Sequence, residues 1–252
     1  MSRQISTDLN QILKQVPNQA IVTAKWLSEQ GVSRQLLLKY KNSQWLKMLA
    51  NGAYVKLNDK FTIDSGIYAL QSQLGLSIHI GGVSALAEHG VSHNIAFNRV
   101  IHLYGKIGET LPRWFKSVFN GQYKYFTTQF LPDGVGLAES KNNDFGTQIS
   151  SKERAILEML YLAPEKTSLK EAYQLMGLML TLRPKLLQEL LEGCSSVKVK
   201  RLFLYIAEKV DYPAFSELNL SKIDLGKGNR VITKGGTLDK KYNIVIGDIE
   251  EI

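Results

Sequence analysis

The chain has 252 residues, of which 44% are hydrophobic and 21% charged, as is usual for a globular protein with a sizeable core. Its 31 Lys and Arg residues exceed its 23 Asp and Glu residues, and the formal charge of +8 makes a polyanionic partner the first class to test, ahead of small-molecule chemistry. No stretch approaches about eighteen consecutive apolar residues and the first residues lack the order of a signal peptide, so we expect a cytoplasmic protein without a membrane span. The single cysteine, Cys194, excludes an internal disulfide and metal clusters built on thiolates.

The positive charge is concentrated near the N-terminus. Residues 1–60 hold nine basic and three acidic residues, whereas residues 61–150 hold six of each and residues 151–252 hold sixteen and fourteen. Three quarters of the surplus therefore lies in less than a quarter of the chain. This asymmetry points to the first sixty residues as the part that meets a polyanion.

The first sixty residues predict three short helices followed by a β-hairpin. Candidate N-caps for the helices are Ser6 or Thr7, Thr23 and Ser33. Gly31 is expected to end the second helix, because glycine tolerates the left-handed conformation of a C-terminal cap. The third helix should run from residue 34 to about residue 41, and Asn51 with Gly52 is a strong turn pair for the hairpin.

The remainder predicts a mixed region followed by a helical one. Expected helices are 63–74, 82–86, 152–162, 169–180, 184–191 and 197–210, and expected strands are 77–80, 99–104 and 123–128, with strand-like sequence again around Gly235 and Gly236. The polar, turn-rich stretch 139–148 is the best internal boundary. The expected domains are therefore 1–60, 61–148 and 149–252.

A helix, a glycine-containing turn, a second helix and a hairpin is the order of a winged helix-turn-helix. On a helical wheel of the third helix, Leu36, Leu37 and Tyr40 share one arc and should pack on the preceding helices. The opposite arc suits a major groove, in which Gln and Asn read adenine, Arg and Lys reach guanine or phosphate, and an exposed Leu meets a thymine methyl group. The candidate DNA-binding residues here are Ser33, Arg34, Gln35, Leu38, Lys39, Lys41 and Asn42.

The alternative for this helix is an ordinary solvated face that ends in lysines. The hairpin that follows and the local charge favour nucleic acid over that alternative. In the hairpin, Lys47, Asn51 and Lys56 are candidates for contacts with the DNA backbone. Tyr54 is expected in the core, because an aromatic residue inside a short strand usually packs.

Several stretches resemble the AbiEi antitoxins, the regulatory halves of bicistronic toxin–antitoxin systems. They are AIVTAKWLSEQGVSRQLLLKYKNSQWLKMLANGAYVKL, IHIGGVSALAEHGVSH, RVIHLYGK and GNRVITKGGTLDKKYNIVI. The resemblance covers nearly the whole chain, and its most specific parts are the wing pattern and the segment GGVSALAEHG.

The resemblance implies an α+β fold: an N-terminal winged helix-turn-helix, then a larger mixed α/β antitoxin region with a helical part and a terminal β-hairpin. It also implies a non-enzymatic protein that represses its own operon by binding inverted repeats in double-stranded promoter DNA. Residues 61–252 together would neutralise a cognate nucleotidyltransferase-like toxin, in many relatives without a stable complex. The reading helix maps onto residues 33–41 and the wing onto residues 45–57. Met48 and Asn51 stand where the family often has basic wing residues, which shifts phosphate contacts to Lys47 and Lys56.

The residues that could form a catalytic or metal site are better explained by structural roles. The four histidines, His79, His89, His93 and His102, lack an accompanying carboxylate cluster, so we expect structural histidines and no metal. Gly81, Gly82 and Ser84 look like a phosphate cradle, but neither a P-loop lysine nor the paired carboxylates of nucleotidyl transfer follow. We therefore expect a tight turn with Ser84 as a helix cap, a buried Cys194 thiol, and no catalytic residue or cofactor.

A second basic surface is a further candidate, formed by Lys198, Lys200 and Arg201, with Lys240 and Lys241 near the final hairpin. It would contact DNA flanks, the toxin or an RNA. The alternative is a solvated face balanced by nearby glutamates, which the low net charge of the region favours.

Two other functions remain open from the sequence. One is a neutraliser that binds or modifies the toxin directly, with DNA binding secondary. The other is a ligand-responsive winged-helix transcription factor without a toxin.

Overall fold

The computed structural model describes residues 11–92, 100–140, 145–179 and 181–249. By internal contacts the chain divides into two compact units. The first unit is Met1–His79, Leu103–Thr127 and Glu139–Gln148, and the second is Ile80–His102, Thr128–Ala138 and Ile149–Ile252. The predicted domains 1–60, 61–148 and 149–252 are continuous segments drawn from the sequence pattern, whereas these units are defined by contacts. The predicted domains therefore stay a prediction.

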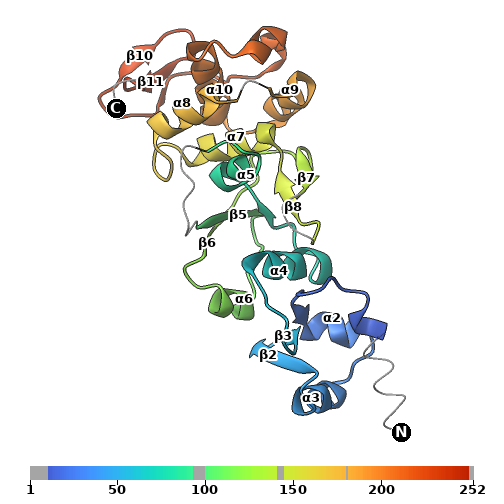
Figure 1. The fold of residues 1–252 in the computed structure, drawn as a ribbon. Coiled ribbons are helices and arrows are strands. Elements are labelled where there is room, and N and C mark those ends of the chain that lie inside the picture. The colour runs from blue at the N-terminus through green and yellow to red at the C-terminus, as the bar shows by residue number, and fades with distance from the viewer. Residues whose placement is uncertain (1–10, 93–99, 141–144, 180, 250–252) are drawn as a thin grey trace. The chain divides into compact units, whose positions relative to one another are not determined.

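The first unit begins with a winged helix-turn-helix (Figure 1). Its elements are β1 (Val22–Thr23), α2 (Ala24–Glu29), α3 (Arg34–Asn42), β2 (Leu46–Ala50) and β3 (Ala53–Lys56), preceded by a helical turn at residues 11–13. The predicted caps of the two described helices are confirmed. Thr23 Oγ1 accepts from the backbone N of Trp26 and Ser33 Oγ from that of Leu36, each at 3.2 Å. The predicted caps Ser6 and Thr7 lie outside the described residues.

The wing is the hairpin of β2 and β3, and β1 extends it to a short antiparallel sheet. The strand order of this wing sheet is β1-β3-β2, so β2 forms one edge. The hairpin turn is the predicted Asn51-Gly52 pair, and Gly52 adopts φ +93°, which favours glycine. At the opposite edge the side chain of Gln73 meets the backbone of β1. Its Oε1 accepts from Thr23 N at 2.8 Å and its Nε2 donates to Ile21 O at 2.7 Å. The side-chain amide of Gln73 in η1 (Ala69–Gln73) therefore supplies the hydrogen-bond partners of two backbone groups, Thr23 N and Ile21 O.

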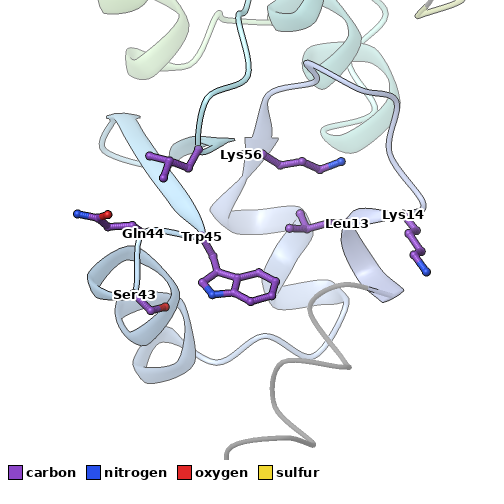
Figure 2. A pocket seen from close by; sticks show the side chains of 7 residues that line it. Leu13, Lys14, Ser43, Gln44, Trp45 and Lys56 are labelled. Carbon is purple, nitrogen blue, oxygen red and sulfur yellow. The ribbon is translucent and has the colours of Figure 1, made fainter.

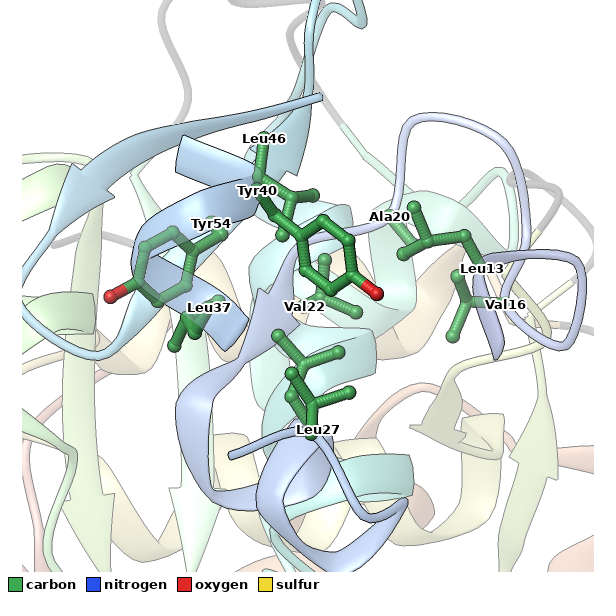
Figure 3. Close-up of a cluster of buried hydrophobic side chains, with 10 residues drawn as sticks. Leu13, Val16, Ala20, Val22, Leu27, Leu37, Tyr40, Leu46 and Tyr54 are labelled. Atoms are coloured by element: carbon green, nitrogen blue, oxygen red, sulfur yellow. The ribbon is translucent and has the colours of Figure 1, made fainter. Parts of the chain in front are cut away.

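One hydrophobic cluster holds the helices to this sheet (Figure 3). Its buried members are Leu13, Val16, Ala20, Val22, Leu27, Val32, Leu37, Tyr40, Leu46 and Tyr54. Tyr54 is in this core, as predicted. Because α3 contributes Leu37 and Tyr40, its opposite face is left toward the solvent.

The rest of the first unit supports the wing. It contains α4 (Ile63–Tyr68), the π-helical turn η1 (Ala69–Gln73), α6 (Arg113–Val118) and β6 (Tyr123–Thr127). The helix predicted at 63–74 is thus an α-helix followed by a wider turn. A five-stranded sheet has the order β6-β5-β4-β8-β7, and four of its strands, all except β6, include residues assigned to the second unit. Its other strands are β5 (Ile101–Gly105), β4 (His79–Ile80), β8 (Gln148–Ser150) and β7 (Leu137–Glu139).

The second unit is mainly helical. Its helices are α5 (Gly82–Glu88), α7 (Lys152–Leu162), α8 (Leu169–Gly177), α9 (Pro184–Gly193), α10 (Val197–Lys209), and the 3-10 turns η2 (Pro213–Glu217) and η3 (Leu220–Lys222). Helices α5, α8, α9 and α10 all contact α7, which is buried along most of its length. The terminal sheet has the order β10-β11-β9, formed by β10 (Thr237–Asp239), β11 (Ile244–Ile246) and β9 (Arg230–Val231).

The predicted α+β class is therefore confirmed. Among the described residues, no helix is long and apolar enough to cross a membrane.

Candidate nucleic-acid interface

Helix α3 presents an exposed polar face on a firmly packed base. Leu37 and Tyr40 are 8% and 4% exposed, as the helical wheel predicts, whereas Leu38 on the opposite side is 51% exposed. All seven candidates of this helix are exposed: Ser33, Arg34, Gln35, Leu38, Lys39, Lys41 and Asn42. The Ser33 side chain is used as the helix cap, which leaves its O–H donor and its second lone pair for a ligand. The face has the donors, acceptors and apolar group that a major groove requires.

The register of the hairpin separates two of the predicted wing lysines. Lys47 lies opposite Val55, and Lys56 lies opposite Leu46. Paired residues share a face of a sheet and neighbouring residues alternate. Lys56 therefore shares the face of the core residue Leu46, and Lys47 is on the other face. The two lysines therefore lie on opposite faces of the hairpin, and their contacts with the DNA backbone stay a prediction.

Lys56 contributes to a surface pocket of about 510 Å³ (Figure 2). The pocket is lined by Leu13, Lys14, Ser43, Gln44, Trp45, Lys56 and Leu57. It lies where the end of α3 meets the start of β2, at the opposite end of the hairpin from its turn. Two ammonium groups beside an indole ring suit an anionic group with an aromatic part.

The wing turn is tight and lies against its neighbours. Asn51 is exposed, whereas the backbone O of Gly52 accepts from Ala24 N at 3.0 Å. A Cβ placed on Gly52 would lie 4.0 Å from Cδ1 of Trp114 in α6. The turn therefore positions Asn51 close to the first residues of α2 and α6.

Helix α6 is an element that sequence reasoning did not connect with the wing. Both α3 and α6 contact β2. The buried side chains of Trp114 and Phe115 anchor α6, and Arg113 and Lys116 are exposed. The Phe115 ring lies 5.0 Å from that of Phe119, measured between centroids.

Most of the positive net charge of the chain belongs to the first unit. The first unit contains fourteen basic and seven acidic residues and the second contains seventeen and sixteen, so +7 of the total +8 lies in the first. Residues 103–127 alone hold four basic residues and one acidic residue. The even balance of residues 61–150 concealed this, because that segment is divided between the units.

The one acidic residue of this stretch, Glu109, is engaged within the fold. Its carboxylate accepts from Ser77 N at 2.9 Å, from Ser77 Oγ at 2.7 Å and from Lys106 N at 3.1 Å. Burial alone would raise the pKa of Glu109, but these hydrogen bonds and the nearby Lys106 charge hold it below the ordinary value. The carboxylate is thus committed to organising a turn.

The predicted second basic surface is wrong for its central residues. Lys200 and Arg201 are 4% and 1% exposed. The Arg201 guanidinium donates to the backbone oxygens of Leu225, Gly226, Gly228 and Asn243 at 2.6–3.2 Å. Lys198 Nζ donates to the oxygens of Tyr161 and Ala163 at 2.7 and 2.8 Å. These cations tie backbone segments together, so they do not form an open surface.

The Gly81-Gly82 segment is occupied by a side chain of the protein itself. Gly81 is the N-cap of α5, and Gly82 N donates to Oε2 of Glu158 at 3.0 Å. Ser84 does not cap the helix as predicted, because its hydroxyl accepts from His102 N at 2.8 Å. The segment that looks like a phosphate cradle therefore receives a carboxylate from α7.

The histidines and the cysteine have structural contacts. His89 Nε2 lies 2.8 Å from Ser150 O, and the His79 ring stacks on Tyr104 with centroids 6.0 Å apart. His93 lies outside the described residues. Within the described part of the chain, no three His, Cys, Asp or Glu side chains are grouped as metal ligands. Cys194 is buried, which raises the pKa of its thiol above the ordinary value.

A helix-turn-helix joined to a hairpin, with most of the positive charge in the same unit, defines a winged-helix protein of the transcriptional-regulator class. Residues 5–97 match the AbiEi antitoxin N-terminal domain, and residues 98–247 match the transcriptional regulator AbiEi antitoxin of type IV toxin–antitoxin systems. The chain belongs to the AbiEi antitoxin family.

A solved structure has a similar fold, the RV2827C protein from Mycobacterium tuberculosis. The TM-score is 0.59 at 14% identity, over 96% of this chain and 89% of that one. At this identity the likeness concerns the fold alone. None of the curated proteins compared with the chain matches it.

Proposed function

We propose that this AbiEi-family antitoxin represses its own operon by binding inverted repeats in promoter DNA, and that it neutralises a cognate nucleotidyltransferase-like toxin. Repression is assigned to the winged helix-turn-helix and neutralisation to residues 61–252. The observation that carries the DNA-binding part is the exposed face of α3, held on a buried base inside the unit that has +7 of the net charge. A reading helix requires this combination of rigidity, exposure and positive charge.

Five exposed residues of α3 have a chemical role in this proposal. Gln35 and Lys39 lie one turn apart and read base edges, while Leu38 meets a thymine methyl group. Arg34 and Lys41 stand at the flanks and bind phosphate or guanine. Two chains on the two halves of an inverted repeat would use the same residues twice.

Binding to the promoter tests this assignment directly. The full chain and its Gln35→Ala and Lys39→Ala variants would be titrated onto the DNA upstream of the gene and onto a scrambled duplex of equal length. We expect the full chain to prefer the promoter and both variants to lose that preference. A matched control is Lys170→Ala, which removes an exposed lysine from α8 of the second unit. Equal binding to promoter and scrambled DNA by the full chain would contradict specific repression.

Neutralisation is tested by co-expression with the protein encoded next to this gene. Full-length chain should restore growth, and the Gln35→Ala and Lys39→Ala variants should restore it equally well, because the proposal assigns neutralisation to a different region. A fragment ending near residue 80 is a poor probe, since it lacks α6 and the other elements of the first unit between residues 103 and 127. If the neighbouring protein is harmless, the antitoxin role is contradicted for this chain.

A direct-binding or toxin-modifying neutraliser remains an alternative for the same region. Co-purification of the two proteins would favour direct binding, whereas a lasting change in the mass of the toxin would favour modification.

A ligand-responsive regulator is a second candidate, favoured by the pocket that contains Lys14, Trp45 and Lys56. The pocket adjoins the end of α3, so an occupant there would be positioned to affect the reading helix. Promoter binding that changes on addition of a small aromatic anion, and that no longer changes in Trp45→Ala, would support it.

A further inference from the structure

We propose that α6 is a second DNA-contacting element, in which Arg113 and Lys116 bind phosphates of the duplex beside the segment read by α3. This inference rests on the proposed promoter binding and deepens it. It assigns a function to residues that lie more than sixty positions beyond the reading helix in the sequence.

The first step in the argument is the position of β2. This strand forms an edge of the wing sheet, and it contacts α3 and α6. In Figure 1 the two helices lie on opposite sides of the hairpin. All three elements belong to the first unit. The elements α3, β2 and α6 therefore adjoin one another within one unit.

The second step is the burial of both faces of the hairpin. Leu46 and Tyr54 belong to the core that the hairpin shares with α3. Lys47 and Val55 are on the other face of the hairpin by the register, and Val55 is 1% exposed although it is not part of that core. The other face is therefore covered as well. Lys47 lies on this other face and is exposed.

The third step is charge. Helix α6 carries Arg113 and Lys116 and no acidic residue. Neither side chain makes an ion pair with a residue that the structure describes. Glu109, the acidic residue of the surrounding stretch, is committed to Ser77 and Lys106. Two exposed cations thus stand beside the wing, on a helix fixed by the buried Trp114.

The experiment compares the salt dependence of promoter binding by the full chain and by the double variant Arg113→Ala, Lys116→Ala. Loss of two phosphate contacts should lower the slope of log K against log salt by about 1.8. When salt is raised from 50 to 200 mM, the affinity of both proteins for the promoter should fall. The fold-loss of the variant should then be about 12 times smaller than the fold-loss of the unaltered chain. Hydroxyl-radical footprints should shorten on one flank, and preference for promoter over scrambled DNA should persist.

The matched control is Lys170→Ala, Lys222→Ala, which removes two exposed lysines from the second unit. It should keep the original slope and footprint. A single Lys116→Gln variant, which preserves side-chain length, should give half the slope change and guards against misfolding of the double variant.

An unchanged slope and footprint in the double variant would overturn the role of α6 while leaving promoter binding by α3 intact. Failure of the unaltered chain to bind any promoter fragment is a different result, because it would contradict the proposed function itself and this inference with it.

Discussion

The carboxylate of Glu158 accepts a hydrogen bond from the backbone N of Gly82 at 3.0 Å, so a side chain of α7 occupies the N-terminal end of α5. The same carboxylate accepts from Ser150 Oγ at 2.7 Å and pairs with Arg154 Nε at 2.9 Å. Glu158 is 1% exposed. A buried carboxylate with several donors is well satisfied, and it explains the paired glycines without a bound phosphate.

Removing this carboxylate should strongly destabilise the second unit. In Glu158→Ala the buried guanidinium of Arg154 loses its ion-pair partner and keeps the backbone oxygens of Pro132 and Val135, while the donors of Gly82 and Ser150 lose their acceptor. We expect a loss of about 3–5 kcal/mol, measured by urea unfolding. The control Glu217→Ala, at an exposed carboxylate, should stay within about 0.5 kcal/mol. A similarly small effect of Glu158→Ala would contradict the structural role assigned to the paired glycines.

Substitutions on α3 and β2 should affect DNA binding in different ways. Gln35→Ala should reduce discrimination between promoter and altered bases by about 1–3 kcal/mol, because a base contact is lost. Lys47→Ala should weaken binding to all sequences equally and lower the salt slope by about 0.9, because a phosphate contact is lost. Binding curves on a set of single-base variants of the promoter measure both effects. If Gln35→Ala and Lys47→Ala changed binding to the promoter variants in the same way, the distinction between a base contact and a phosphate contact would be contradicted.

Acid should weaken the contact between α7 and the start of α9. Burial alone would raise the pKa of Glu153, but hydrogen bonds from Arg183 outweigh it and lower the pKa to about 2. A depressed carboxyl pKa stabilises the fold above the unfolded value of about 4.5, and this contribution disappears as the pH falls from about 4.5 toward 2. The free energy of unfolding should fall by about 2 kcal/mol over this range. This is less than the full pKa shift would give, because the Arg183 side chain is 66% exposed and solvent screens the pair.

The matched variant for this pH effect is Glu153→Gln. Its unfolding free energy should be lower at pH 6 and should change less between pH 4.5 and pH 2 than that of the unaltered chain. Parallel curves for the two proteins would show that Glu153 is not the titrating group.

Arg201 should be a stability residue, which differs from both sequence-based interpretations, a basic contact surface and a solvated face. Arg201→Met removes the donors to the oxygens of Leu225, Gly226, Gly228 and Asn243. Each hydrogen bond to a charged group contributes about 1.5–3 kcal/mol, so we expect a loss of at least about 3 kcal/mol and faster proteolysis after residue 224. Promoter binding at a temperature where the variant is folded should not change. Reduced promoter binding with unaltered stability would restore the surface interpretation.

The sequence predicts the winged helix well because its signals are local. Thr23 and Ser33 cap helices within three residues of themselves, and the Asn51-Gly52 pair specifies its own turn. The apolar spacing in α3 likewise requires only one helical period to place Leu37 and Tyr40. The α+β class follows from the same kind of short-range pattern.

Long-range placement was not predictable in the same way. Nothing near Arg201 in the sequence indicates that it meets backbone oxygens 24–42 residues further along. Arg113 and Lys116 stand 66 and 69 positions after Lys47, and segment charge counts concealed them. Lys47 and Lys56 lie on opposite faces of the hairpin because of its register. A count of basic residues gives no information on that register. The groove assignments of α3 stay a prediction.

The first unit is assembled from three separate stretches of the chain, and this has a consequence for how relatives can exchange promoter preference. A recombination event that replaced only the first sixty codons would set a foreign β2 strand against the resident α6. The incoming wing would then meet Trp114 and the α6 cations of a different lineage. Inheritance of a new DNA preference therefore requires two distant parts of the gene to move or to diverge together.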